Sequence, residues 1–190
     1  MHMSQTNEII LAGFGGQGVL SLGQILSYAA MLEEKQVSWM PSYGPEMRGG
    51  TANCIVIVSE NRISSPIVST FDAGIILNQP SMDKFLSKIQ PSGLLLYEQS
   101  TIVKPPLRFD IEILCIPAMV EAQKIGSRQV ANVVMLGAFL ERRPIVSIDS
   151  VVKTLKKVLP AHRQTLLPLN EQALVRGKEL AVSAREPARA

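Results

Sequence analysis

Apolar residues along the chain form short uninterrupted runs, and segments of helical spacing follow these runs. Residues 8–12 read Glu-Ile-Ile-Leu-Ala, and a glycine-rich segment, residues 13–18, comes directly after them. This order is typical of a buried strand that turns sharply into a helix. Beyond the turn, apolar residues recur every three or four positions from Val19 to the polar Glu33-Glu34-Lys35, which predicts an amphipathic helix of that extent.

The same alternation of strand and helix patterns continues to the C-terminus. Pro41 is expected to end the second strand, because proline has no N–H for a sheet ladder. Ser147 with Asp149 is expected to cap one helix, and Asn170 another. The expected strands are residues 8–12, 37–40, 51–58, 63–66, 73–77, 93–97 and 110–116, and the expected helices are 19–33, 80–89, 119–124, 130–140, 147–159 and 170–182.

This alternation predicts a single Rossmann-like α/β domain of three layers, with a mostly parallel sheet, a β-hairpin excursion near residues 51–66 and C-terminal helices. A length of 190 residues, 46% of them hydrophobic and 18% charged, suffices for one core and is short for two. The same figures exclude a disordered, collagen-like or coiled-coil protein. The domain is expected at residues 7–182, between an N-terminal extension, residues 1–6, that looks like a cloning remnant, and a flexible C-terminal tail, residues 183–190.

The charge pattern predicts neither a nucleic-acid nor a membrane partner. The net charge is only +3 and the aromatic content 5%, which leaves few stacking platforms for bases. Lys153, Lys156 and Lys157 fit a solvated helix face better than a binding patch. The longest apolar stretch, near residues 130–140, is shorter than the ~18 residues of a membrane span. No basic leader precedes an apolar segment, so a soluble cytoplasmic protein is expected.

Metal-binding residue types are scarce. Cys54 and Cys115 both lie inside apolar runs and are expected to be buried, reduced thiols. The sequence contains no CxxC, and His162 is the only histidine outside the opening Met1-His2-Met3. These residues are too few for a zinc site or an iron–sulfur cluster, so no metal site is expected in this chain.

Gly13, Gly15 and Gly18 match G-x-G-x-x-G between a predicted strand and a predicted helix. Glycines there allow a tight turn and close backbone approach, and they expose a helix N-terminus that attracts anions. A dinucleotide site also requires an acidic residue at the end of the second strand, and residues 37–41 contain none. Another anionic or small ligand, tight packing and a partner surface remain open.

A second unusual segment, residues 41–51, follows that strand and reads Pro-Ser-Tyr-Gly-Pro-Glu-Met-Arg-Gly-Gly-Thr. One interpretation is a surface loop with a local pair between Glu46 and Arg48. The other is a rigid loop that presents these two charges to a ligand or partner at the sheet edge. Asn78-Gln79-Pro80 fits either a plain helix-entry turn or a place on the same edge.

The segments AGFGGQGV (residues 12–19) and SYGPEMRGGTANC (residues 42–54), with Asn78-Gln79-Pro80, resemble the gamma subunit, or gamma domain, of the 2-oxoacid:ferredoxin oxidoreductases over residues 7–182. The resemblance implies a complex that decarboxylates a 2-oxoacid, with 2-oxoglutarate favoured, by means of thiamine diphosphate and Mg²⁺. Electrons then pass through iron–sulfur clusters to ferredoxin, and coenzyme A receives the acyl group. This sequence lacks a G-D-G…N signature and a cysteine cluster. It therefore resembles the part that holds neither cofactor, has no catalytic residue and is inactive alone.

The resemblance also implies which residues face the cofactor-bearing subunits and which partners they meet. Arg48 is expected to bind an acidic group of a partner, the substrate or coenzyme A. The partners are the alpha and beta subunits, a delta subunit where the complex has one, and indirectly ferredoxin; the isolated chain is expected to be able to self-associate. The implied cofactor-binding residues are Gly13, Gly15, Gly16, Gln17, Gly18, Ser42, Tyr43, Gly44, Pro45, Glu46, Arg48, Gly49 and Asn78.

Three alternatives remain open from the sequence. The chain also fits the beta subunit of an indolepyruvate oxidoreductase, which shares this domain type. A free-standing dinucleotide-binding protein rests on the glycine loop alone. The third alternative is a scaffold that binds no ligand.

Overall fold

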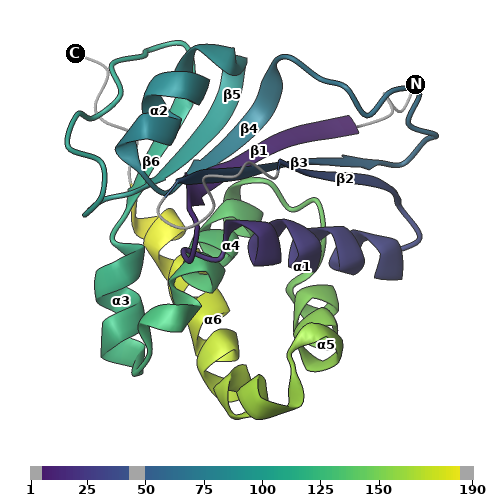
Figure 1. The fold of residues 1–190 in the computed structure, drawn as a ribbon, viewed down its shortest axis with the longest axis vertical. Coiled ribbons are helices and arrows are strands. Elements are labelled where there is room, and N and C mark those ends of the chain that lie inside the picture. The colour runs from purple at the N-terminus through teal and green to yellow at the C-terminus, as the bar shows by residue number, and fades with distance from the viewer. Residues whose placement is uncertain (1–5, 43–49, 185–190) are drawn as a thin grey trace.

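The protein is described by a computed structural model that covers residues 6–42 and 50–184, without the side chains of residues 161–163. Its strands are β1 (Thr6–Phe14), β2 (Gln36–Ser42), β3 (Thr51–Ser59), β4 (Phe71–Ile76), β5 (Ile89–Glu98) and β6 (Glu112–Ile116). They form one sheet in the order β2-β3-β1-β4-β5-β6 (Figure 1). Strands β1, β4, β5 and β6 run parallel, whereas β3 is antiparallel to both β1 and β2.

Helices cover both faces of this sheet. They are α1 (Val19–Leu32), α2 (Gln79–Phe85), α3 (Ala118–Ile125), α4 (Ala131–Arg142), α5 (Ile148–Val158) and α6 (Leu167–Ser183), with short 3₁₀ helices η1 (Leu86–Lys88), η2 (Arg128–Val130) and η3 (Ala161–Leu166). Figure 1 shows α2 alone above the sheet, while α1 and α3 to α6 lie below it. The predicted α/β fold class with C-terminal helices is therefore confirmed.

Each face of the sheet has its own core, which explains the uninterrupted apolar runs in the sequence. In β1, Ile9 and Leu11 belong to the larger core, which packs against α1 and α4. Ile10 and Ala12 point to the opposite face, into the smaller core against α2. Because successive strand residues face opposite sides and both sides are covered, a central strand needs an apolar side chain at every position.

Local signals placed most helix ends correctly. The first helix begins at Val19, as predicted, and ends one residue before Glu33. The Oγ of Ser147 accepts a hydrogen bond from the Ser150 N–H at 3.1 Å, which confirms it as the cap of α5. Such a side-chain cap satisfies a helix-start N–H that has no partner within the helix.

The hairpin expected near residues 51–66 is wrong. Its first arm is β3, but residues 60–70 form no strand. The expected second arm, residues 63–66, contains two serines and a proline, so it has no continuous apolar face to bury. Strand β3 pairs instead with β1 and β2, and it inserts between them.

Three further expectations are wrong. Pro41 lies within β2, opposite Cys54; β2 is an edge strand, where a proline can be accommodated without breaking the sheet. Asn170 lies inside α6, which begins at Leu167, so it does not cap that helix. Cys115 is exposed because its strand, β6, forms the other edge of the sheet, whereas Cys54 is buried as expected.

Candidate functional site

The carboxyl ends of the parallel strands define one edge of the sheet, and the sequence motifs gather there. Strand β2 also ends at this edge, and β3 begins there because it runs antiparallel. The Gly15 N–H donates to the Gly50 carbonyl at 3.1 Å and so ties the glycine loop, residues 13–18, to the segment before β3. Ligand sites of open α/β sheets occupy this position. Tyr43, Gly44, Pro45, Glu46, Arg48 and Gly49 lie outside the described residues.

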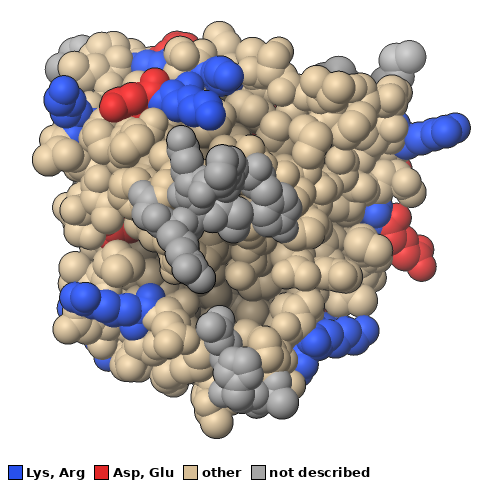
Figure 2. All heavy atoms as spheres, in the orientation of Figure 1, with Lys and Arg blue, Asp and Glu red and all other residues tan. Residues whose placement is uncertain are grey.

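The charged side chains of the described residues lie mostly toward the margin of this side of the molecule. Figure 2 shows Lys, Arg, Asp and Glu mostly toward the outline of the view, with uncharged residues between them.

The glycines of the loop have different surroundings. Gly18 has a φ of +77° and starts α1, and a Cβ on it would lie 2.6 Å from the Asn132 side-chain nitrogen. Gly16 has a φ of +97°, but a Cβ there would meet nothing within 4 Å. The loop is therefore packed tightly at Gly18 and open at Gly16. Only the open end leaves room for another molecule.

Gln17 acts as an internal brace of the glycine loop. Its Oε1 accepts from the Phe14 N–H at 2.6 Å, and its Nε2 donates to the Leu77 carbonyl at 3.0 Å. A Cβ on Gly13 would lie 2.7 Å from that same Oε1, so a glycine is needed there to admit the amide. The Gln17 amide thus joins the end of β1 to the residue after β4.

A buried carboxylate at the end of β5, Glu98, escaped the sequence analysis. Its side chain is 2% exposed and accepts backbone N–H bonds from Ser100 at 2.7 Å, Thr101 at 3.0 Å and Met119 at 3.1 Å. The bond from Met119 caps the start of α3. The sequence does contain a signal for this role: Glu98 ends an apolar strand and is followed closely by Ser100 and Thr101, whose N–H groups it can accept from in a turn. Glu98 therefore holds the edge together and leaves little capacity for a ligand.

Asn78 lies fully buried at the start of α2. Its Oδ1 accepts from the Ser81 N–H at 2.8 Å, so it is the side-chain cap of this helix. Its Nδ2 has no hydrogen-bond partner in the part of the chain that the structure describes. A buried donor without a partner is costly, so Asn78 is both a helix-entry residue and an available donor at this edge.

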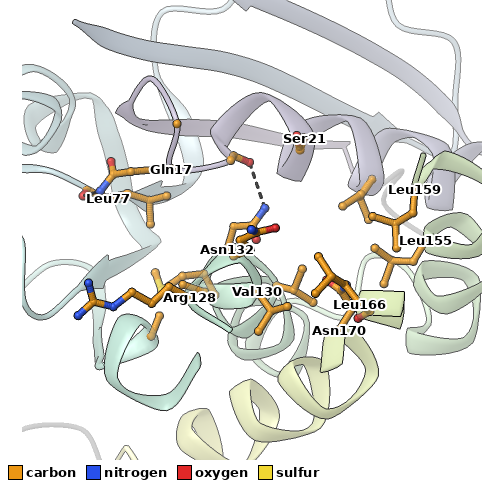
Figure 3. A pocket seen from close by; sticks show the side chains of 18 of the residues that line it. Gln17, Ser21, Leu77, Arg128, Val130, Asn132, Leu155, Leu159, Leu166 and Asn170 are labelled. Carbon is orange, nitrogen blue, oxygen red and sulfur yellow. Dashed lines mark hydrogen bonds between the residues drawn. The ribbon is translucent and has the colours of Figure 1, made fainter. Parts of the chain in front are cut away.

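A cavity of about 630 Å³ opens beside the glycine loop, on the face of the sheet that α1 and α4 cover. Figure 3 shows its walls converging from α1, α4, α5 and α6. Its lining combines apolar side chains with a few polar ones: Gln17, Ser21, Ile25, Leu77, Glu98, Met119, Arg128, Val130, Asn132, Met135, Leu155, Leu159, Leu166 and Asn170 are among them. Sequence reasoning missed the cavity because its lining is drawn from residues 16 to 170 and has no local pattern.

The cavity is weakly charged. Among its described lining residues only Glu98 and Arg128 carry charge. The Arg128 guanidinium donates to Gln123 Oε1 at 3.1 Å, and Figure 3 shows it directed away from the cavity centre. Helices α1, α4 and α6 begin beside the cavity without a side-chain cap. The first N–H groups of α4 and α6 already donate to the Arg128 and Gln164 carbonyls of the preceding 3₁₀ helices.

The described residues offer little metal or thiol chemistry. No group of three or more His, Cys, Asp and Glu side chains that could hold a metal ion exists within residues 6–42 and 50–184. Cys54 and Cys115 are both free thiols, and burial raises the pKa of Cys54 to about 12. No helix in the described ranges is long and apolar enough to cross a membrane.

The sheet order weighs against a dinucleotide at the glycine loop. In dinucleotide-binding sheets the second strand lies beside the first and presents an acidic residue to the ribose. Here β3 lies between β1 and β2, which moves the end of β2 one strand farther from the loop. Neither Met40 nor Ser42 at that end is acidic.

Known proteins are similar to this chain in sequence and in fold. The sequence profile of the pyruvate ferredoxin/flavodoxin oxidoreductase family matches residues 8–180. The ketoisovalerate oxidoreductase subunit VorA of Methanothermobacter thermautotrophicus is 37% identical over 177 residues, which are 92% of this chain and 36% of VorA. The 2-oxoglutarate synthase subunit KorC of Methanocaldococcus jannaschii is 35% identical over 156 residues, which are 80% of this chain and 83% of KorC.

A solved structure agrees with these relatives. The crystal structure of the gamma subunit of keto/oxoacid ferredoxin oxidoreductase from Geobacter sulfurreducens PCA superposes with a TM-score of 0.81 at 30% identity, covering 94% of this chain and 99% of that chain. Fold and site together define an α/β domain with a glycine loop at the carboxyl edge of a mixed sheet. This chain belongs to the pyruvate ferredoxin/flavodoxin oxidoreductase family, which confirms the resemblance drawn from its motifs. It spans only about a third of the length of VorA.

Proposed function

We propose that this chain is the gamma subunit of a cytoplasmic 2-oxoacid:ferredoxin oxidoreductase that yields acyl-CoA, CO₂ and reduced ferredoxin. One observation carries the proposal: the same domain occurs in two forms among the relatives. It matches nearly the whole Geobacter gamma subunit and most of KorC, but about a third of VorA. A domain that exists both as a separate chain and within a longer chain is expected to dock in both cases against the same neighbouring parts. For this chain the proposed neighbours are the alpha and beta subunits and, where present, a delta subunit.

The residues present do not fit the cofactors of such a complex. The Mg²⁺ of thiamine diphosphate requires oxygen ligands, and an iron–sulfur cluster requires several thiolates. The described chain offers no acidic cluster for the first, and Cys54 and Cys115 are too few for the second. We therefore derive no step through these groups, and assign this chain the support of the site and of the subunit interface.

The proposed interface is the carboxyl edge of the sheet. Gly16 leaves open space in front of the glycine loop, and Asn78 offers a buried N–H donor without a partner among the described residues. The charged side chains of the described residues lie mostly toward the margin of this face (Figure 2). Residues 42–49 continue from the end of β2 at this edge, so Arg48 is proposed to bind an acidic group of a partner subunit, the substrate or coenzyme A.

2-Oxoglutarate is proposed as the substrate. KorC and the pyruvate synthase subunit PorC of Methanothermobacter thermautotrophicus are matched over similar shares of their length, 83% and 85%, but KorC is 35% identical and PorC 28%, whereas only 36% of VorA is matched. Turnover of 2-oxoglutarate, 2-ketoisovalerate and pyruvate by the assembled complex tests the choice. Preference for either of the other two acids reassigns the substrate, and turnover of indolepyruvate reassigns the complex.

The interface is tested by Arg48→Ala, with Arg62→Ala as the matched control. Arg62 is exposed and follows β3 at the opposite edge of the sheet. A charge-assisted hydrogen bond contributes about 1.5–3 kcal/mol. Arg48→Ala is therefore expected to weaken co-purification of the subunits, or to raise the KM for coenzyme A, about tenfold or more.

The isolated variant should keep its circular dichroism spectrum and melting temperature, which separates this effect from misfolding. Arg62→Ala should leave assembly, KM and turnover unchanged. If Arg48→Ala also leaves all three unchanged, residues 42–49 take no part in assembly or in coenzyme A use.

A further inference from the structure

Two amide oxygens at the cavity accept no hydrogen bond from the described residues. Asn132 is 9% exposed and Asn170 is 5% exposed, and both line the cavity. The Nδ2 of Asn132 donates to the Gly18 carbonyl at 3.2 Å, and that of Asn170 to the Leu166 carbonyl at 2.8 Å. Neither Oδ1 accepts a hydrogen bond from any described residue.

The unpaired Oδ1 atoms of Asn132 and Asn170 come from two different helices that show the same arrangement. Asn132 lies near the start of α4 and Asn170 near the start of α6. The Nδ2 of each donates a hydrogen bond to a carbonyl at the start of a helix, Gly18 for Asn132 and Leu166 for Asn170. Figure 3 shows both side chains at the cavity, with the bond from Asn132 to the glycine loop drawn. Neither oxygen is among the fully buried atoms that lack a partner, so each is reachable from the cavity and can accept a hydrogen bond from a ligand there.

Many of the other residues that line the cavity are aliphatic, so they favour a ligand with an apolar body. Val130, Leu155, Leu159 and Leu166 line the cavity together with Ile25 and Met135. A volume of about 630 Å³ lies within the range of small-molecule sites. Aliphatic walls around a few polar groups are the usual composition of such sites.

The charges of the site favour an uncharged ligand. The Glu98 carboxylate lines the cavity and would repel an anion, as would the two amide oxygens. A cation would lose its hydration within an aliphatic wall that offers it no unpaired carboxylate. The unpaired groups that Asn132 and Asn170 offer are oxygen acceptors, so the best group donates a hydrogen bond without carrying charge.

We propose that this cavity binds a small uncharged ligand with an aliphatic body and a primary amide or hydroxyl group, which donates to Asn132 Oδ1 or Asn170 Oδ1. The proposal concerns the interior of this chain and goes beyond its role as a subunit. It requires no partner subunit, so it can be tested on the 190-residue chain alone.

The test uses three probes that have the same number of non-hydrogen atoms. Hexanamide donates and accepts, methyl pentanoate only accepts, and hexanoate carries a charge. Titration of the full chain, followed by calorimetry and by amide NMR shifts, is expected to give a Kd of about 1 mM or tighter for hexanamide. The other two probes should bind at least about tenfold more weakly, since each lacks a buried hydrogen bond or brings a charge. Equal binding of the three, or no binding of hexanamide, overturns the proposal.

A pair of variants locates the binding. Leu159 lines the cavity and is half-buried, so Leu159→Trp should fill the space and abolish hexanamide binding. Lys156 is exposed on the preceding turn and does not line the cavity, so Lys156→Trp should bind as the unchanged chain does. Circular dichroism checks the fold of both variants, and the probe series stands on the unchanged chain if one of them unfolds. Hexanamide binding that persists in folded Leu159→Trp places the ligand elsewhere and overturns the proposal.

Discussion

Two groups of buried and half-buried polar side chains lie at the same edge of the sheet, and they differ in how completely their hydrogen bonds are used. Around the Leu77 carbonyl, Gln17 and Thr101 both donate to one oxygen, and Glu98 accepts three backbone N–H bonds. Across the cavity, Asn132 and Asn170 use their donors within the chain and leave their oxygens unpaired.

The difference separates structural polar groups from groups that are available to a ligand. A buried network that is fully paired fixes the positions of the loops that meet in it. An amide oxygen that faces the cavity without a partner in the described chain is available to accept a hydrogen bond from a ligand. The glycine loop joins the two groups, because Gln17 belongs to the first and Gly18 contacts Asn132 of the second.

The largest effect is expected from removal of the central acceptor of the paired group. Glu98→Ala leaves the N–H groups of Ser100, Thr101 and Met119 without their partner, so the free energy of unfolding should fall by about 2–4 kcal/mol. Urea denaturation measures this. Glu98→Gln keeps one oxygen acceptor and should lose less. A loss below about 1 kcal/mol for the alanine variant would show that this network does not hold the edge.

The next effect tests the contact between the two groups. Gly18→Ala introduces a Cβ at a φ of +77° and 2.6 Å from the Asn132 side chain, so a loss of about 2–3 kcal/mol is expected. Gly16→Ala is the matched control, since its φ is +97° but its surroundings are open, and it should lose only about 1–2 kcal/mol. Thermal or urea denaturation compares the two variants. Equal losses would mean that the contact with Asn132 adds nothing.

A smaller effect is expected for the brace of the glycine loop. Gln17→Ala removes the acceptor for Phe14 and one of two donors to Leu77, which should lower the free energy of unfolding by about 1 kcal/mol. Amide hydrogen exchange should show faster exchange at Phe14 in particular. Unchanged exchange at that amide would contradict the role of Gln17 as a brace.

The smallest effect concerns the contact between the end of α1 and the start of α5 and depends on pH. Burial acts to raise the pKa of Glu33, but the hydrogen bond from the Ser147 N–H, 2.7 Å long, and the neighbouring Lys35 leave it below its usual value. A lowered pKa means that the carboxylate stabilises the fold above the unfolded value, 4.5, and that this contribution is lost as the pH falls through the lower folded value.

Glu33→Gln should therefore lower stability by no more than about 1 kcal/mol at pH 7 and by less at pH 3. Urea denaturation at both values measures the difference, with Glu34→Gln, an exposed neighbour, as the control. A stability difference that is the same at both pH values would show that the Glu33 carboxylate has no special interaction in the folded chain.

Local sequence signals predicted the elements but not all of their pairings. The run before the glycine loop and the spacing after Val19 were sufficient for β1 and α1, because a strand buried on both faces and an amphipathic helix each leave a short-range pattern. The partner of β3 left no such pattern. Adjacency suggested a hairpin with residues 63–66, whereas β3 lies between β1 and β2.

The candidate site divides in the same way. The glycine loop, Ser42 and Asn78 were recognised from motifs, and the structure brings them to one edge because parallel strands end together. Glu98, Asn132 and Asn170 were missed or misassigned, since nothing near them in the sequence states which backbone groups they meet.

The sequence by itself determined the α/β class, the glycine loop and the family, since these depend on residues that are close together in the chain. Only the tertiary structure decided which buried polar atoms are paired and which face the cavity. The physical reason is that a hydrogen bond depends on distances of a few ångströms between residues such as Gly18 and Asn132, which lie 114 positions apart.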